Sequence, residues 1–149
     1  MANSQALATS FKVEQMNGIH AMGTTVVRGG TGADTWKAAL YTTSGTLGAG
    51  TTAYSATNEI SSAGYTAGGV TFTWVAPNSS GTTAFTTPSA SFSWTGITAG
   101  PFDACLLYNS TQSNKAMGTY TFGAQTITAG NFSLTMPTND ASTGLFRIA

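Results

Sequence analysis

Two acidic residues, Glu59 and Asp103, lie within or beside predicted strands, where a carboxylate could take part in catalysis. A glycosidase needs two carboxylates that face each other across a cleft, so this pair is the main candidate for an enzyme active site. Each acid also has a structural interpretation, Glu59 as a solvent-facing residue beside Ile60 and Asp103 as a hydrogen-bonded acid at a strand edge. We favour the structural interpretation for both.

The chain has one histidine, His20, and one cysteine, Cys105, that could support nucleophilic catalysis. A Ser-His-Asp triad would have to use His20, but the G-x-S-x-G pattern of a nucleophile elbow is absent. Cys105 falls in the middle of a predicted strand, where it fits a small core residue better than a nucleophile paired with His20. We therefore predict that the protein is not an enzyme and has no catalytic residues.

The sequence also predicts no metal site and no cofactor site. The run Gly29-Gly30-Thr31-Gly32 is glycine-rich, but it lacks the Lys-Ser/Thr pair and the preceding strand of a phosphate-binding loop, so we interpret it as a flexible loop. Zinc requires clustered Cys and His, and the chain has one of each. Calcium requires several carboxylates in one loop, whereas Asn139-Asp140 offers a single acid beside an amide and is more typical of a turn.

The aromatic residues have two possible roles. They could form a flat platform on which sugars stack, which would make the chain a glycan-binding module. However, each Trp lies on an alternating segment with apolar residues two positions away, so burial in the core is the favoured interpretation. The residues concerned are Trp36, Trp74, Trp94, Tyr41, Tyr54, Tyr65, Tyr108 and Tyr120.

The composition excludes several classes of protein. Only 7% of the 149 residues are charged, and five Lys+Arg balance five Asp+Glu. The basic residues are scattered singly, so we predict binding neither to nucleic acid nor to a membrane surface, and no apolar run approaches the length of about 18 residues that spans a bilayer. The N-terminus lacks the features of a signal peptide, so we expect synthesis in a cytoplasm without general export.

Alternating apolar and polar residues predict an all-β fold, an antiparallel β-sandwich or jelly roll of seven to eight short strands with a short N-terminal helix. The helix is expected around residues 10–17. We divide the chain into an N-terminal segment, 1–34, which could act as an arm, and a β-sandwich domain, 35–149. The strands are expected at 36–42, 58–61, 70–76, 90–94, 102–108, 116–122, 132–136 and 145–148.

Three Thr-Ala-Gly triplets, at residues 66–68, 98–100 and 128–130, are spaced 32 and 30 residues apart. They could mark the repeat unit of a solenoid or propeller. We favour a simpler interpretation, that glycine supplies unusual backbone angles near the strands of a Thr-, Ala- and Gly-rich chain.

A series of turn and strand signatures runs along the chain from about residue 10 to the end. The segments are Phe11-Lys12-Val13-Glu14, Asn17-Gly18-Ile19-His20, residues 35–42, 52–60 and 64–69, and Leu145-Phe146-Arg147-Ile148-Ala149. Together they resemble a group of small virion proteins of tailed bacteriophages. The resemblance implies a structural role, foremost that of a capsid cement (decoration) protein, with tail-associated roles also open. Because the motifs are turn and strand signatures, no site residues carry over.

These observations lead to a structural hypothesis. We expect a virion protein, assembled in the host cytoplasm, that binds the major capsid protein from outside and associates with itself as a dimer or trimer. Residues 1–34 are the first candidate anchor and the long loop 44–57 is the second, because loops of this length commonly make contacts. The alternatives are a glycan-binding module and a tail-associated module. Zero net charge favours assembly, since nothing repels like molecules.

Overall fold

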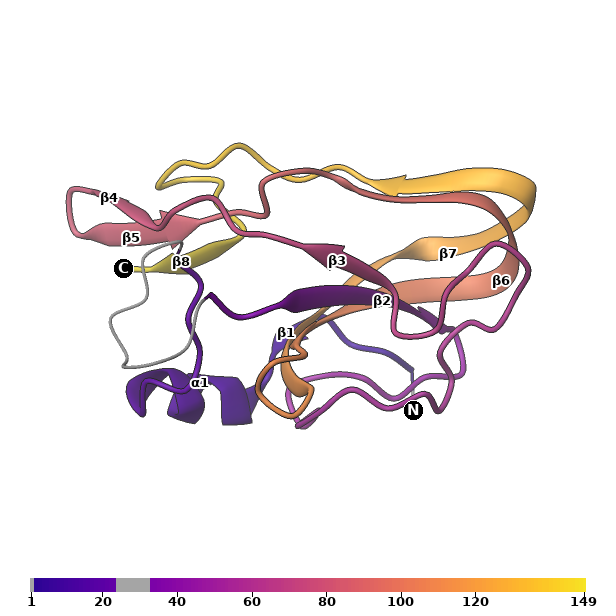
Figure 1. The fold of residues 1–149 in the computed structure, drawn as a ribbon, viewed down its shortest axis with the longest axis horizontal. Helices are drawn as coiled ribbons and strands as arrows, with labels where there is room; N and C mark the ends of the chain where they lie inside the picture. Colours follow the sequence, from indigo (N-terminus) through magenta and orange to yellow (C-terminus); the bar gives the residue numbers. More distant parts are fainter. Residues whose placement is uncertain (1, 24–32) are drawn as a thin grey trace.

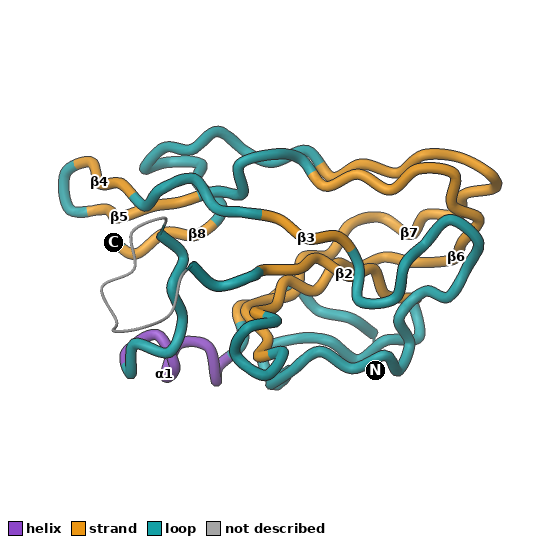
Figure 2. The backbone as a smooth tube through the Cα atoms, viewed as in Figure 1, coloured by secondary structure: helices purple, strands orange, loops and turns teal. Residues whose placement is uncertain are grey.

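Two antiparallel sheets and one short helix make up the part of the chain that the computed structural model describes, residues 2–23 and 33–149 (Figure 2). The larger sheet has the strand order β1-β7-β6-β2-β3 and the smaller one β4-β5-β8. The predicted all-β class and the short N-terminal helix are confirmed. The elements are β1 (Ala6–Leu7), α1 (Thr9–Met16), β2 (Trp36–Thr42), β3 (Val70–Phe72), β4 (Asn78–Ser80), β5 (Thr83–Thr86), β6 (Phe92–Asn109), β7 (Lys115–Leu134) and β8 (Phe146–Ile148).

The dominant feature is the long hairpin of β6 and β7, which curls back over the sheet at one end of the molecule (Figure 1). The sequence predicts two separate strands in each half, at 90–94 and 102–108 and at 116–122 and 132–136, and this prediction is wrong. The ladder continues through a series of bulges between Trp94 and Ala104. Positive φ angles at Gly96, Gly100 and Ala129 bend it there. Each bulge shifts the alternation of inward and outward side chains. One bent strand therefore shows the sequence pattern of two separate strands.

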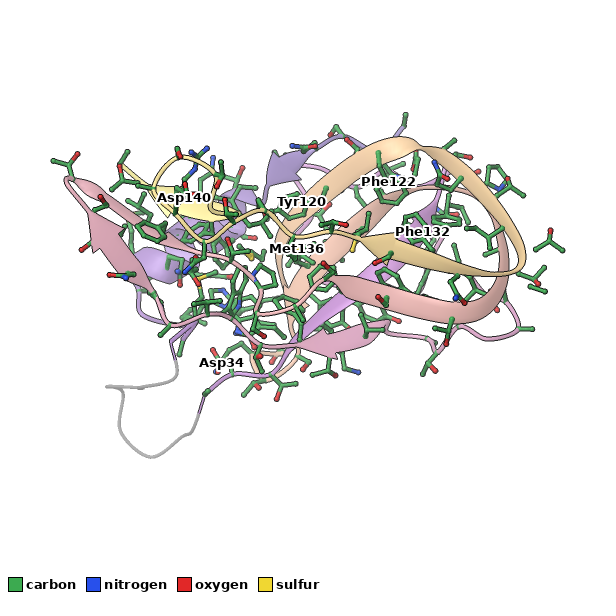
Figure 3. All side chains as sticks on the ribbon, turned by 90° about the horizontal axis from the view of Figure 1, so that it is seen from above. Asp34, Tyr120, Phe122, Phe132, Met136 and Asp140 are labelled. Carbon is green, nitrogen blue, oxygen red and sulfur yellow. The ribbon has the colours of Figure 1, made fainter. Side chains whose placement is uncertain are left out.

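Aromatic rings fill the space enclosed by the curled hairpin. Phe132 packs against Phe102 with ring centroids 4.9 Å apart and against Trp94 at 5.9 Å. Phe122 completes the group at 5.3 Å from Phe132, and both lie within the curve of β7 (Figure 3). Such pairs contribute about 0.5–1.5 kcal/mol each beyond the area they bury. These aromatic side chains therefore fill the core that the curled hairpin encloses.

The short elements agree with the sequence in part. The helix and β8 fall where they were expected, but between the expected strands 70–76 and 90–94 the chain forms an additional hairpin, in which the turn at Gly81, with φ 58°, joins β4 to β5. The predicted strand at 58–61 is reduced to a single bridge between Glu59 and Tyr41. The helix found in the described ranges is too short to cross a membrane.

Two of the three Thr-Ala-Gly triplets lie in the bend of the hairpin, where Gly100 and Ala129 adopt positive φ. The third precedes Gly69, whose added Cβ atom would come within 1.9 Å of the carbonyl oxygen of Ala38. Close approach and bending thus explain the triplets, as the simpler interpretation expects.

Candidate functional site

A buried hydrogen-bond cluster surrounds Glu59, one of the two candidate acids. Its Oε1 accepts hydrogen bonds from the Tyr65 hydroxyl (2.7 Å) and the Gly68 backbone N–H (2.7 Å), and its Oε2 accepts one from the Tyr54 hydroxyl (2.6 Å). The prediction that Glu59 faces solvent is wrong, because only 8% of the residue is exposed. Three donors compensate the burial of the carboxylate, which is costly without hydrogen bonds.

Tyr108 of β6 joins this cluster to the sheet. Its ring stacks on that of Tyr54 with centroids 4.7 Å apart, and its hydroxyl donates to the carbonyl oxygen of Gly68 over 2.8 Å. We call the group the loop clamp, because it ties residues 54–68 to the strands. Its members are Tyr54, Glu59, Tyr65, Gly68 and Tyr108.

The tyrosines of the loop clamp are held in their protonated form. Burial raises the pKa of Tyr54 and of Tyr65 well above the usual value, and the hydrogen bond to Glu59 raises both further. Burial, together with the charge of Glu59, raises the pKa of Tyr108 to about 12. The hydroxyls therefore remain hydrogen-bond donors across the physiological pH range.

Asp103, the other candidate acid, lies at a bulge of β6. Thr42 pairs with Phe102 and Tyr41 pairs with Ala104, so Asp103 has no partner on β2. Its Oδ1 accepts a hydrogen bond from Asn3 Nδ2 over 2.6 Å, which confirms its interpretation as a hydrogen-bonded acid. The cavity of about 270 Å³ beside Glu59 does not include Asp103. The two acids thus have separate partners, and the structure does not bring them together across that cavity.

A second polar cluster surrounds Asn109, the last residue of β6, which is fully buried. Asn109 Nδ2 donates to His20 Nδ1 (3.0 Å) and to Asp34 Oδ2 (2.8 Å). His20 Nε2 donates to Glu14 Oε2 over 2.8 Å, and Lys115 forms an ion pair with the other oxygen of Glu14. We call these five residues the helix clamp, because they tie α1 and the following segment to the β6–β7 hairpin.

His20 acts in the helix clamp as a neutral imidazole. Since Asn109 donates to Nδ1, the proton is assigned to Nε2, which donates it to Glu14. Burial lowers the pKa of His20, and the neighbouring carboxylates of Glu14 and Asp34 only partly oppose this. The His20 side chain is 0% exposed, and its hydrogen bonds to Glu14 and Asn109 hold α1 against the hairpin.

Glu14 is the charged partner of His20. Burial raises its pKa, but hydrogen bonds from Lys115 and His20, together with the positive charge of Lys115, outweigh burial and lower the pKa below the usual value. Glu14 is therefore ionised at neutral pH, and the cluster contains a stable ion pair with Lys115.

The remaining candidates for chemistry also have structural roles. Burial raises the pKa of the Cys105 thiol strongly, as suits the core residue that its position predicts. Asp140 (Figure 3) accepts hydrogen bonds from Thr138, Ser142 and Thr143, which confirms a turn and lowers its pKa. The glycine run 29–32 lies outside the described residues. Within residues 2–23 and 33–149, no three His, Cys, Asp or Glu gather as a metal site would require.

The aromatic platform expected of a sugar-binding surface is not formed by the tryptophans. Trp36, Trp74 and Trp94 are 1%, 4% and 4% exposed, which confirms the favoured core interpretation for all three. Tyr41 and Tyr108 are also buried. Tyr54 and Tyr65 are half-buried, but their hydroxyls are committed to Glu59.

Comparison of the chain with protein-family models, with curated protein sequences and with solved structures finds no match. The role of the protein therefore has to be argued from its own residues.

Two features of the site are missed by reasoning from the sequence. Asn109 lies just past the expected strand 102–108 and is not among the candidate site residues, yet it is the centre of the helix clamp. The signal that could have pointed to it is its position directly after the apolar run 104–108, which predicts burial for the next inward side chain. Tyr54 lies five residues before Glu59 and Tyr65 lies six residues after it. Neither spacing matches the period of a strand or a helix, so the sequence pattern does not indicate that they meet.

Proposed function

We propose that the chain is a virion structural protein, a cement protein that binds the outside of a phage capsid as a homo-oligomer and stabilises contacts between capsid subunits. The observation that carries the proposal is the scarcity of charge on its surface. Of the described residues with a formal charge, Lys12 and Arg147 alone are largely exposed. Proteins that stay dispersed normally expose many charges, whereas the centres of protein interfaces are depleted of Lys, Glu and Asp. Such a surface suits a chain packed against other chains.

The use of the acidic groups also supports a role without catalysis. Glu14, Asp34 and Glu59 are buried in the two clamps, and Asp103 is bonded to Asn3. A catalytic acid or base has to reach a substrate, while these groups hold segments of the chain to the sheet. The resemblance to phage virion proteins agrees with this function.

The outer edge of β7 supports the homo-oligomer in the proposal. On the side away from β6, β1 pairs with Gly118 and Thr119, and from Tyr120 to Leu134 the described residues provide no further strand. From Ala116 to Leu134 the strand contains no charged residue and no proline, which are two of the features that protect an edge from pairing. A second copy pairing here in antiparallel fashion would form a symmetric interface.

A cement protein stabilises the shell because it binds the assembled state only. Each bound copy shifts the equilibrium toward the intact shell by mass action. Many copies of a modest interface act together when an oligomer contacts several capsid subunits at once. With so few exposed charges, the contact should depend mainly on apolar burial and hydrogen bonds.

The test is the copy number and location of the chain in purified particles. Quantitative mass spectrometry should find many copies per particle that follow the major capsid protein when heads and tails are separated. Electron cryo-microscopy should place its density outside the shell. A few copies that follow the tail fraction would favour the tail-associated alternative, and absence from particles would refute the proposal.

Self-association has a separate test. Sedimentation of the purified chain should show a dimer or trimer. Thr121→Lys, which adds a charge to the open part of β7, should produce monomers. The matched control is Thr71→Lys on the edge strand β3, which should leave the oligomer intact. A wild-type monomer would contradict the homo-oligomer.

A further inference from the structure

A groove of about 640 Å³ lies between the edge strands of the two sheets. β1 is the outermost strand of the larger sheet and β8 that of the smaller one (Figure 1). Residues 5–7 line the groove from the β1 side and residues 145–147 from the β8 side, and Thr119 and Tyr120 of β7 also line it. The groove is therefore the place where both sheets end beside each other.

The β1 side of the groove presents backbone groups that no other strand uses. Ala8 N–H donates to the carbonyl oxygen of Met117 over 2.8 Å, which continues the β1–β7 ladder. In an antiparallel ladder every second residue bonds to the neighbouring strand, so Ala6 also bonds to β7, while Gln5 and Leu7 direct their N–H and C=O groups away from it. The free edge of β1 therefore offers donors and acceptors to a further strand.

The β8 side presents its backbone groups in the same way. A two-residue turn joins β4 to β5, so Ser80 and Thr83, which flank it, exchange backbone hydrogen bonds. Counting along the ladders from this pair, Phe146 and Ile148 bond to β5. Arg147 lies between them and directs its N–H and C=O groups away from β5, at a position that lines the groove. Both sides of the groove are thus free strand edges.

We propose that this groove, which we call the strand groove, binds an extended peptide segment of a different protein chain, which adds as a strand between β1 and β8. Resting on the proposed function, we take that chain to be the capsid subunit. Each edge of the groove lacks a row of backbone partners, and an extended peptide is the ligand that provides such a row on both of its sides. A segment of three or four residues, at about 3.3 Å per residue, matches the three residues of β8.

A strand of a second copy does not meet this requirement. A segment that pairs with β1 on one side and with β8 on the other needs both of its own edges free. Each of the strands in the described ranges, from β1 to β8, already pairs with at least one neighbour. The open edge of β7 is free on one side only, so it suits pairing between copies and not insertion into the strand groove. The occupant is therefore an unpaired segment of another chain.

The side chains of the strand groove specify the composition of that segment. Apolar side chains from three strands line the groove, among them Leu7 and Tyr120. Successive side chains of a strand point to opposite faces, so every second residue of the segment meets this lining and should be apolar. The guanidinium of Arg147 already donates to the carbonyl oxygens of Ala141 and Ser142. Binding should therefore depend on backbone hydrogen bonds and apolar burial more than on charge.

The test removes backbone donors from the two sides of the groove and leaves the ladders within the protein intact. Gln5→Pro and Arg147→Pro each delete an N–H group that points away from the neighbouring strand, and an edge strand tolerates proline at such a position. Wild type and variants are added to capsids purified from a phage that lacks this chain. Each proline variant should bind about tenfold more weakly than the wild type, because the inserted strand loses a backbone hydrogen bond.

The matched controls are Gln5→Ala and Arg147→Ala, which remove the same exposed side chains and keep the N–H groups. They should bind within about twofold of the wild type, and thermal unfolding should show that all four variants fold. Hydrogen exchange of the wild type is a second measurement. Peptides that cover residues 5–7 and 145–148 should gain protection on capsids, and peptides that cover residues 70–73, at the edge strand β3, should not.

Proline variants that bind as tightly as their alanine counterparts would overturn the strand groove and leave the proposed function standing. If the wild type does not bind capsids, the proposed function fails, and the strand groove fails with it. If the proline variants become monomers in sedimentation while the alanine variants remain oligomers, the groove holds a strand of a second copy, which also overturns the inference.

Discussion

The helix clamp and the loop clamp each contain one buried glutamate, and they compensate its burial with different groups. Glu14 meets a lysine cation, whose attraction is screened by salt, and a neutral histidine, whose protonation depends on pH. Glu59 meets two phenol groups and a backbone N–H, which are neutral donors. The helix clamp holds α1 and the residues after it to the β6–β7 hairpin, and the loop clamp holds residues 54–68 to the same sheet. The difference indicates that this chain, with few charges, uses them mainly to fix its own segments rather than to solubilise its surface.

The largest expected effect comes from breaking the helix clamp at its centre. Asn109→Ala leaves the His20 and Asp34 side chains buried without this donor, and removes the acceptor of the Thr111 and Gln112 backbone N–H groups. The loss of four hydrogen bonds made by one fully buried side chain should cost about 3–5 kcal/mol of the free energy of unfolding. Chemical denaturation provides the measurement.

The matched control for Asn109→Ala is Asn131→Ala. Asn131 is exposed and its side chain accepts one hydrogen bond, from the backbone N–H of Gly96 at 3.1 Å. This substitution should change stability by less than about 0.5 kcal/mol. Equal losses in the two variants would mean that the helix clamp is not a cooperative network.

Substitutions in the loop clamp should reduce the free energy of unfolding less than Asn109→Ala does, and Tyr65→Phe should reduce it more than Tyr54→Phe. Tyr65→Phe removes the donor to Glu59 and the acceptor of the Leu40 N–H, which should cost about 2 kcal/mol. Tyr54→Phe removes one donor and keeps the ring stacked on Tyr108, which should cost about 1 kcal/mol. Both variants retain the aromatic ring, so packing is matched. A larger loss for Tyr54→Phe would show that the hydrogen bonds do not govern this clamp.

Lys115→Met tests the ion pair between Lys115 and Glu14 in the helix clamp. The lysine side chain is 34% exposed, so solvent screens its ion pair with Glu14, and the loss should be about 1 kcal/mol at low salt. The difference from the wild type should shrink as salt is raised, whereas that of Tyr65→Phe should not. Lys12→Met, at an exposed lysine without an ion pair among the described residues, serves as the control and should leave stability unchanged. A loss at Lys115 that is independent of salt would contradict the electrostatic account.

The sequence predicts what depends on local periodicity and misses what depends on distant contacts. Residues 36–42 contain no glycine or proline that would interrupt a strand, and they form β2 as expected. The bends in β6 and β7 were mistaken for strand ends, because a bulge and a loop both interrupt alternation. Burial of the three tryptophans follows from their apolar neighbours. The helix clamp could not be predicted, since His20 and Asn109 are 89 residues apart and meet only after the hairpin has formed.

The smallest expected effect is a change in how the free energy of unfolding varies with pH. The helix clamp affects this variation at acidic pH and the loop clamp at alkaline pH. Because burial lowers the pKa of His20 below its usual value of 6.5, the unfolded chain binds this proton more readily than the folded one. Stability should therefore decline as pH falls below about 6.5, and further below about 4.5, where the lowered pKa of Glu14 acts in the same direction. The loop clamp behaves oppositely, because the raised pKa values of its tyrosines make stability decline as pH rises above about 10.

His20 is the single histidine of the chain, so the acid slope between pH 6.5 and 5 can be assigned to it. In His20→Gln that slope should flatten while the alkaline decline persists, and in Tyr65→Phe the alkaline decline should weaken while the acid slope persists. Denaturant unfolding at a series of pH values measures both in one set of experiments. If His20→Gln retained the wild-type slope in that window, the histidine would not be buried in its neutral form, and the account of the helix clamp would have to be abandoned.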